Sequence, residues 1–297
     1  MRVVVAPGQG SQSQGFLAAW IEGVAGFREI LEQYSEFSSQ DLVTLGTTGT
    51  EEQIKDTAIA QPLIVAAALA SYRTMFSDVK VDAVAGHSVG EFAAAALAGV
   101  LTDEDALRLV AIRAQAMAKA ASEAETSMAA ILGGDQESVL EAIANHDLHA
   151  ANYNGAGQIV AAGAKAGITA LIASPPEKAR VIELKVAGAF HTSYMESAKA
   201  ELQKAAAALS PKDPNIPLYS NQAGQLVSSG QEFLDLLVSQ VTNPVRWDLV
   251  MDNFKDKNAE VIELLPAGAL SGLFKRAVED CRTVALKSPS DFEKVER

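Results

Sequence analysis

The segment from residue 82 to residue 100 constrains the fold of this chain more than any other. It begins with a short β-forming run, continues with Gly-His-Ser-Val-Gly at residues 86–90, and ends in a helical pattern over residues 91–100 that is apolar all round. A helix without a polar face is buried, and a strand that leads into such a helix is typical of a parallel sheet. The segment therefore predicts an α/β fold with this strand and this helix near its centre.

Two further β-forming runs, at residues 3–5 and 261–264, also lead toward glycine. The chain also carries helical patterns at residues 61–75, 91–101, 103–121, 193–209 and 231–241. Strands that alternate with helices favour a parallel sheet covered on both faces. We therefore predict a large unit with a parallel sheet, formed by residues 1–122 and 189–297.

The middle of the chain has a different pattern. Strands are expected at residues 128–132, 148–153, 158–162 and 181–186, and helices at residues 136–145 and 166–173. The resulting order, βαββαβ, is the ferredoxin-like pattern, which can fold as an inserted unit. We place this insertion at residues 123–188.

Composition and charge exclude several classes of protein. The 297 residues carry a formal net charge of −13, which leaves no basic stripe for nucleic acid. The uncharged apolar run at residues 57–72 is too short to span a bilayer, and Pro7 comes too early for a signal peptide. A single cysteine, Cys281, cannot form an internal disulfide. We expect a cytoplasmic monomer that binds neither nucleic acid nor membranes.

The Gly-His-Ser-Val-Gly sequence can carry chemistry at Ser88. A serine on a sharp turn between a strand and a helix is held exposed, and the flanking glycines let the turn close. The helix that follows presents free N–H groups and the positive end of its dipole beside the hydroxyl. The alternative is an ordinary turn that contains serine, but the strand and the buried helix favour a nucleophile.

A glycine-rich turn also follows the first β-forming run, with Pro-Gly-Gln-Gly-Ser-Gln at residues 7–12. As a dinucleotide site it lacks the third glycine of G-x-G-x-x-G, and no Walker lysine follows it. Loops at the carboxyl ends of neighbouring parallel strands converge, which would place Gln9 beside Ser88. We therefore expect backbone N–H groups of this turn to contribute to an oxyanion hole.

Of the four histidines, His191 is the best candidate for a base that activates Ser88, because it stands at a strand-to-helix junction. We expect the side chain of His87 to point away from the nucleophile. His146 and His149 have a spacing that could suggest a metal, but no third ligand cluster lies near them in the sequence. We interpret them as a solvated pair and expect no metal site.

Arg113 lies on the largely apolar face of its predicted helix, beside Leu109, Val110, Ala116 and Met117. An unpaired buried charge costs several kcal/mol, so a guanidinium at this position has to meet an anion. The helix pattern leaves two possibilities open. One is an ion pair with an internal carboxylate, and the other is a bidentate clamp for a substrate carboxylate beside the serine.

These features together resemble the malonyl-CoA:acyl-carrier-protein transacylase family of fatty-acid and polyketide synthesis. The resemblance spans almost the whole chain and depends on several motifs in order. They lie at residues 7–12, 61–62, 86–91, 113, 157–158, 188–191, 220–221, 243–247 and 263–268. The resemblance implies a larger α/β-hydrolase-like subdomain, a smaller ferredoxin-like subdomain, and an active site in the cleft between them.

The resemblance also implies roles for individual residues. Ser88 would be the nucleophile and His191 its general base. Backbone N–H groups of Gln9 and Val89 would form the oxyanion hole. Arg113 would hold the malonyl carboxylate, which favours the substrate clamp over the internal ion pair.

The family resemblance also has implications for the segment with Asn243 and Arg246 and for Phe190. A main-chain carbonyl near the segment that contains Asn243 and Arg246 would orient the histidine in place of the acid of a triad. Phe190, directly before the histidine, is similar to the malonyl-preferring members. Two departures from the family pattern, Ala156 in place of a proline and Leu-Pro-Ala-Gly at residues 265–268, concern local loop shape.

The implied activity is transfer of malonyl from malonyl-CoA to the phosphopantetheine thiol of acyl carrier protein through a malonyl-serine, with no cofactor. Three alternatives stay open: a serine esterase, an inactive relative that serves as a binding subunit, and the acyltransferase subunit of a malonate decarboxylase. The first is disfavoured, because hydrolases of this fold carry their histidine near the C-terminus. In this chain, His191 lies far from the end of the 297 residues.

Overall fold

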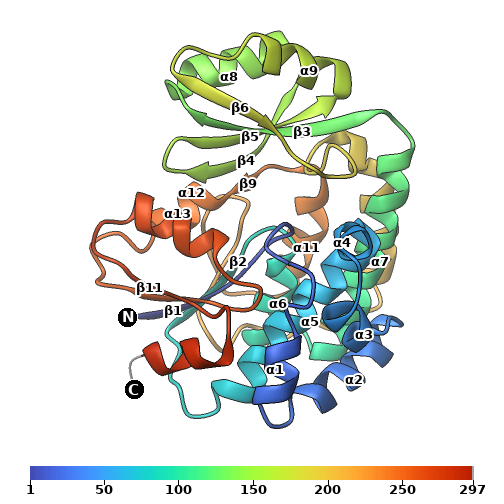
Figure 1. The fold of residues 1–297 in the computed structure, drawn as a ribbon, viewed down its shortest axis with the longest axis vertical. Helices are drawn as coiled ribbons and strands as arrows, with labels where there is room; N and C mark the ends of the chain where they lie inside the picture. The colour runs from blue at the N-terminus through green and yellow to red at the C-terminus, as the bar shows by residue number, and fades with distance from the viewer. Residues whose placement is uncertain (296–297) are drawn as a thin grey trace.

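The structure of this chain, a computed structural model, describes residues 1–295 as two units, one above the other in Figure 1. The large unit is built on a six-stranded sheet. Its strands follow the order β11 (Arg282–Ala285), β10 (Glu260–Glu263), β1 (Arg2–Ala6), β2 (Ala83–Gly86), β7 (Leu218–Tyr219) and β8 (Leu226–Val227). Every neighbouring pair is parallel except β7 with β8. The predicted parallel sheet is therefore confirmed.

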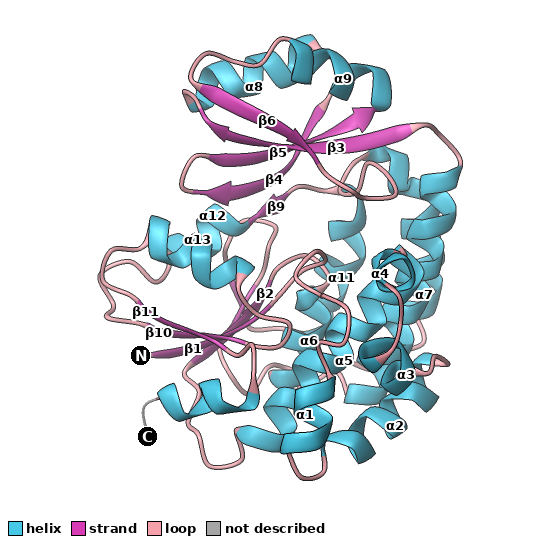
Figure 2. Cartoon of the chain, viewed as in Figure 1, coloured by secondary structure: helices cyan, strands magenta, loops and turns pink. Residues whose placement is uncertain are grey.

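Helices cover both faces of this sheet (Figure 2). On one face, a single core joins the sheet to α1 (Ala18–Gly23), α2 (Phe27–Ser38), α3 (Leu42–Thr47), α4 (Glu51–Lys55), α5 (Thr57–Met75), α6 (Gly90–Leu97), α7 (Asp103–Ser122), α10 (Glu196–Ala206) and α11 (Gly230–Ser239). The other face packs against α12 (Trp247–Asp252) and α13 (Ala269–Ala277). Val4 of β1 belongs to the first core, whereas Val3 and Val5 belong to the second. Burial on both faces explains why this strand is an unbroken apolar run.

The helix after Ser88 is the buried centre that the sequence predicts. Every residue of α6 is buried, including the one charged residue in it, Glu91. The helices predicted at residues 61–75 and 103–121 are confirmed as α5 and α7. The helices α1 to α4 were not predicted. α1, α3 and α4 are too short to establish a helical period, whereas α2 was missed although it buries Phe27, Leu31 and Tyr34 at helical spacing.

The small unit contains a five-stranded sheet. Its strands follow the order β6 (Ala179–Glu183), β3 (Thr126–Gly133), β5 (Gln158–Ala164), β4 (His149–Gly155) and β9 (Val245–Arg246). With α8 (Gln136–Asn145) and α9 (Lys165–Ala173), the chain order from β3 to β6 is the predicted βαββαβ. The extent of the unit, residues 123–188, stays a prediction. β9 comes from the large unit and pairs in parallel with β4; its two residues are too few to show a strand pattern.

The carboxyl ends of β1 and β2 bring two loops together. The strands are neighbours, and Ala6 pairs with Gly86 at their last residues. A Cβ atom at Gly90 would stand 2.3 Å from the main-chain oxygen of Ala6, and one at Gly8 would stand 2.8 Å from Nδ1 of His87. The predicted convergence of the glycine-rich turn on the serine turn is therefore confirmed, and glycine at residue 90 makes it possible.

We expect Gly90→Ala to lower the free energy of unfolding by about 1–3 kcal/mol, the usual cost of overpacking a core. Urea denaturation of the two proteins measures this difference. The matched control is Gly272→Ala within α13, where a methyl group would meet only a guanidinium nitrogen of Arg276 at 3.5 Å. That change should be neutral or stabilising, because alanine is the better helix former. Equal losses in the two variants would contradict this interpretation.

Candidate active site

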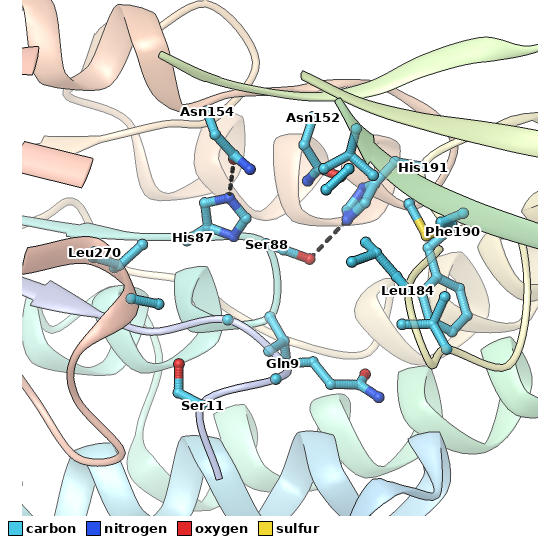
Figure 3. Close-up of a pocket in the computed structure, with 18 of the residues that line it drawn as sticks. Gln9, Ser11, His87, Ser88, Asn152, Asn154, Leu184, Phe190, His191 and Leu270 are labelled. Carbon is cyan, nitrogen blue, oxygen red and sulfur yellow. Dashed lines mark hydrogen bonds between the residues drawn. The ribbon is translucent and has the colours of Figure 1, made fainter. Parts of the chain in front are cut away.

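A cavity of about 500 Å³ lies between the two units and is lined by residues of both. Ser88 and Arg113 line it from the large unit, and Met128, Asn152 and Val160 line it from the small unit. Figure 3 shows Ser88 and His191 pointing toward one another inside it. The sheet of the small unit is thus the roof of the site, and the strand ends of the large unit are its floor.

Ser88 is placed for nucleophilic attack. Its backbone lies in the left-handed region with φ of 51°, as expected for a sharp strand-to-helix turn. The side chain of Asn221 fastens this turn at both ends: its Oδ1 accepts the N–H of Ser88 at 2.6 Å, and its Nδ2 donates to the carbonyl of Gly86 at 2.5 Å. Because Asn221 is fully buried, water does not compete for these bonds.

His191 is oriented as a base toward Ser88. Its Nε2 lies 2.7 Å from Oγ of Ser88, and its Nδ1 lies 2.8 Å from the main-chain oxygen of Gln240. A carbonyl can only accept, so Nδ1 carries the proton and Nε2 is free to accept the hydroxyl proton.

The carbonyl at hydrogen-bond distance from His191 belongs to Gln240, three residues before the segment with Asn243 and Arg246 near which it was predicted, and the backbone of Asn243 also influences the imidazole. Asn243 donates through Nδ2 to the carbonyl of Ser239 at 2.7 Å. Arg246 pairs with Asp248 at 2.8 Å. A main-chain acceptor leaves no side-chain signature, so its position could not be read from the sequence.

Burial lowers the pKa of His191 to about 3, and the positive charge of Arg113 acts in the same direction. The hydrogen bond to Gln240 opposes both effects but is the weaker influence. His191 is therefore in its neutral, basic form at physiological pH. A neutral imidazole is what a general base needs before the reaction begins.

Arg113 is fully buried, yet its guanidinium makes no direct contact with a carboxylate of residues 1–295. Its two terminal nitrogens donate to Oε1 of Gln61 at 2.6 Å and to Oε1 of Gln240 at 2.7 Å. One of them also lies 3.4 Å from Oγ of Ser88, and Nε has no hydrogen-bond partner among residues 1–295. Burial lowers the pKa of Arg113 to about 10, so the group stays charged at neutral pH. The arrangement leaves a cation beside the nucleophile that an incoming carboxylate can neutralise.

The other predicted positions also border the cavity. Gln9, Val89 and Phe190 all line it. Within residues 1–295, the backbone N–H groups of Gln9 and Val89 have no recorded acceptor, which leaves them free to donate to a substrate. Phe190 is buried and lies in Figure 3 on the same side as His191.

The side chain of His87 is directed toward Asn154 and not toward the hydroxyl of Ser88, as predicted, but it also borders the site. Its ring lines the same cavity, and its Nε2 lies 2.9 Å from Oδ1 of Asn154 on β4 (Figure 3). Burial lowers the pKa of His87, so it too is neutral. This contact joins the serine turn to the roof of the site. It could not be foreseen, because the side chain of residue 87 meets a strand that is distant in sequence.

The histidines predicted as a solvated pair lie outside the site. Nδ1 of His146 bonds to the carbonyl of Ala142 one turn back on α8. His149 begins β4 and is exposed. In the part of the chain that the structure describes, no group of three or more His, Cys, Asp or Glu side chains is placed to hold a metal ion.

With this geometry in view, comparison with known proteins is informative. The model of the family described as "Acyl transferase domain" matches residues 3–289. This chain belongs to that acyl transferase family. The resemblance inferred from the sequence motifs is therefore confirmed.

Individual acyl transferases agree over the full length. A malonyl CoA-acyl carrier protein transacylase of Mycobacterium bovis is 44% identical over 300 residues, which cover 99% of each chain. The crystal structure of MCAT from Mycobacterium tuberculosis superposes with a TM-score of 0.92 at 44% identity, covering 99% of this chain and 98% of that one. A type II PKS acyl-carrier protein in complex with its malonyl-transacylase gives a TM-score of 0.92 at 29% identity, covering 99% of this chain and 98% of that one.

None of the helices formed by residues 1–295 combines the length and apolar character that a membrane span requires.

We expect the imidazole of His191 to stay neutral well below pH 6.5, since its pKa is lowered from 6.5 to about 3. The unfolded chain takes up this proton near pH 6.5, so His191 contributes a loss of folding stability as the pH falls below that value. Nuclear magnetic resonance of labelled histidine side chains measures the titration, with a free histidine peptide as the control. A His191 signal that titrates near pH 6.5 would contradict the interpretation.

Proposed function

We propose that this chain transfers the malonyl group from malonyl-CoA to the phosphopantetheine thiol of acyl carrier protein, through a malonyl ester on Ser88. One observation carries the choice of acyl group. The buried guanidinium of Arg113 lies 3.4 Å from the nucleophilic oxygen, and no carboxylate of the described residues contacts it directly. An acyl group that ends in a carboxylate supplies the missing anion at the right distance from the serine.

The first half of the reaction loads the serine. Oγ of Ser88 attacks the thioester carbon while Nε2 of His191 takes its proton. The oxyanion of the tetrahedral intermediate accepts from the backbone N–H groups of Gln9 and Val89, and one such donor is typically worth about 2.7–4 kcal/mol. The bond to sulfur then breaks, and the CoA thiol leaves with the proton that His191 had accepted.

The second half reverses these roles. The phosphopantetheine thiol gives its proton to His191 and attacks the ester carbon of malonyl-Ser88. The same two backbone donors stabilise the second oxyanion. Ser88 leaves as the alkoxide and regains its proton from His191. The reaction as written uses only side chains and backbone groups of this chain, with no cofactor.

Several relatives support this assignment. The curated proteins that match over the full length bear the name of this transacylase, and one similar structure is a complex with an acyl-carrier protein. A chain with this activity and no membrane-spanning helix among its described residues fits a place in the cytoplasm, which we propose as its location. We also propose that it acts as a monomer, because the cavity takes all of its predicted groups from one chain.

We expect Ser88→Ala to abolish formation of the acyl-enzyme, because the variant has no other nucleophile 2.7 Å from the base. Intact-protein mass spectrometry after mixing with malonyl-CoA, and again after adding carrier protein, measures loading and discharge. A malonyl adduct on the wild type that only the carrier removes supports the transacylase. An adduct that water removes quickly supports an esterase, and a stable adduct on the variant would overturn the role of Ser88.

We expect Arg113→Ala to cost malonyl transfer about 3–5 kcal/mol in transition-state stabilisation, the range for an unpaired buried charge, while acetyl transfer survives. The ratio of kcat/KM for malonyl-CoA to that for acetyl-CoA measures this selectivity. The control is Arg108→Ala on the same helix, where the guanidinium is exposed and pairs with Glu104 at 2.6 Å. Equal losses for malonyl and acetyl in Arg113→Ala would make its role purely structural.

A further inference from the structure

Glu91 is an unusual residue in its surroundings. It stands in the first turn of α6, where every neighbour along the helix is apolar or glycine, and it is 1% exposed. No salt bridge reaches its carboxylate from the described residues, and the nearby cation, Arg113, is separated from it by the side chain of Gln240. Burying a carboxylate costs free energy unless hydrogen bonds or a nearby cation stabilise its charge. The reaction as described above makes no use of it.

The carboxylate of Glu91 holds two amides that in turn hold the reacting groups. Oε1 accepts the backbone N–H of Asn221 at 2.7 Å, and Oε2 accepts from Nε2 of Gln240. Asn221 fastens the turn around Ser88 at both ends. Gln240 donates from the same Nε2 to the carbonyl of Ser88 at 3.0 Å, and its own carbonyl orients His191.

The charge of Glu91 also decides which way the amide of Gln240 faces. A carboxylate only accepts, so it attracts the amino end of the Gln240 side chain. The carbonyl end, Oε1, is thereby turned toward Arg113, 2.7 Å from its terminal nitrogen. If Gln240 turned over, its amino group would face the N–H groups of Arg113, and two donors would oppose each other.

We propose that Glu91 is a positioning residue for malonyl transfer, whose ionised carboxylate fixes the Ser88 turn through Asn221 and the malonyl clamp Arg113 through Gln240. This inference rests on the proposed function, since it names the group that keeps that site in its active geometry. Glu91 touches neither substrate nor His191. It acts through the two amides that lie between.

A neutral side chain of the same size cannot replace it. In Glu91→Gln, the backbone N–H of Asn221 cannot turn, so it keeps the new carbonyl oxygen. The new amino group then faces Gln240, which has to present its own carbonyl oxygen and turn its amino group toward Arg113. Glu91→Gln therefore keeps the volume of the side chain but displaces the guanidinium of Arg113 from its position beside Ser88.

The same reasoning gives the site a pH dependence. Burial raises the pKa of Glu91 to about 7, while hydrogen bonds from Asn221, Gln240 and Ser220 and the charge of Arg113 act against burial. Arg113 on α7 is the charged side chain that faces Glu91 from the packed elements, and the nearby His87 and His191 are held neutral by burial. As the pH falls through about 7, Glu91 takes up a proton and no longer attracts the amino group of Gln240 as a carboxylate does. Malonyl loading should fall with it.

The first experiment measures the rate of acyl-serine formation from malonyl-CoA and from acetyl-CoA on both sides of pH 7, by rapid quench and mass spectrometry. In wild type we expect malonyl loading to fall on the acid side. In Glu91→Gln we expect malonyl loading to fall by about tenfold to a hundredfold, because small misplacements cost that much. Acetyl loading should fall less, and the acid-side fall should disappear. The control is Glu260→Gln. Glu260 is the first residue of β10 and does not line the cavity, and its carboxylate pairs with Arg2 at 2.8 Å.

A second variant keeps the charge at residue 91 and guards against misfolding of the first. In Glu91→Asp, a carboxylate still attracts the amino end of Gln240, so the carbonyl end of Gln240 stays turned toward Arg113. Recovery of the malonyl-to-acetyl ratio relative to Glu91→Gln supports the proposal. A folded Glu91→Asp enzyme without recovery overturns it, as do a wild type with no fall near pH 7 and a Glu91→Gln enzyme that loses both acyl groups equally. A wild type that never loads malonyl would instead sink the proposed function itself.

Discussion

The active geometry of this protein depends on Gln240. Its main-chain carbonyl fixes the proton on Nδ1 of His191, and its side-chain carbonyl receives Arg113. Its amino group bonds to the carbonyl of Ser88 and to Glu91. His191, Arg113 and Ser88 are therefore all hydrogen-bonded to one residue. Because Gln240 is almost fully buried, water does not compete for these hydrogen bonds.

The two units enclose the site, which the hydrogen bonds around Gln240 do not do by themselves. The strand ends of the large unit present the nucleophile and two backbone donors, but leave them open above. The sheet of the small unit closes over them, and the contact between His87 and Asn154 joins the two across the cavity. A partly closed cavity strengthens the electrostatic interactions within it and protects an ester intermediate from water. Transfer to a thiol rather than hydrolysis requires both effects.

Sequence reasoning succeeded where one residue type carried the signal. Ser88 and Gln9 follow strands directly, so the convergence of their loops could be predicted from strand order alone. Arg113 was identified as unusual because a guanidinium on an apolar helical face demands an anion. It gave only the neighbourhood where the signal was a main-chain atom, as with the carbonyl of Gln240, and it did not give contacts between distant segments, as between His87 and Asn154. Glu91 was present in the motif but was passed over as part of an apolar helix.

The sequence by itself determined the class of fold and the order of elements in the small unit, and it singled out Ser88 and His191 as candidates for nucleophile and base. These follow from local periodicity and from glycines that permit sharp turns, which are properties of short segments. The tertiary structure alone decided the partners of Arg113, the acceptor for His191 and the network around Glu91. Hydrogen-bond partners depend on positions and orientations within tenths of an ångström between segments far apart in the chain. Only the packed core fixes those positions.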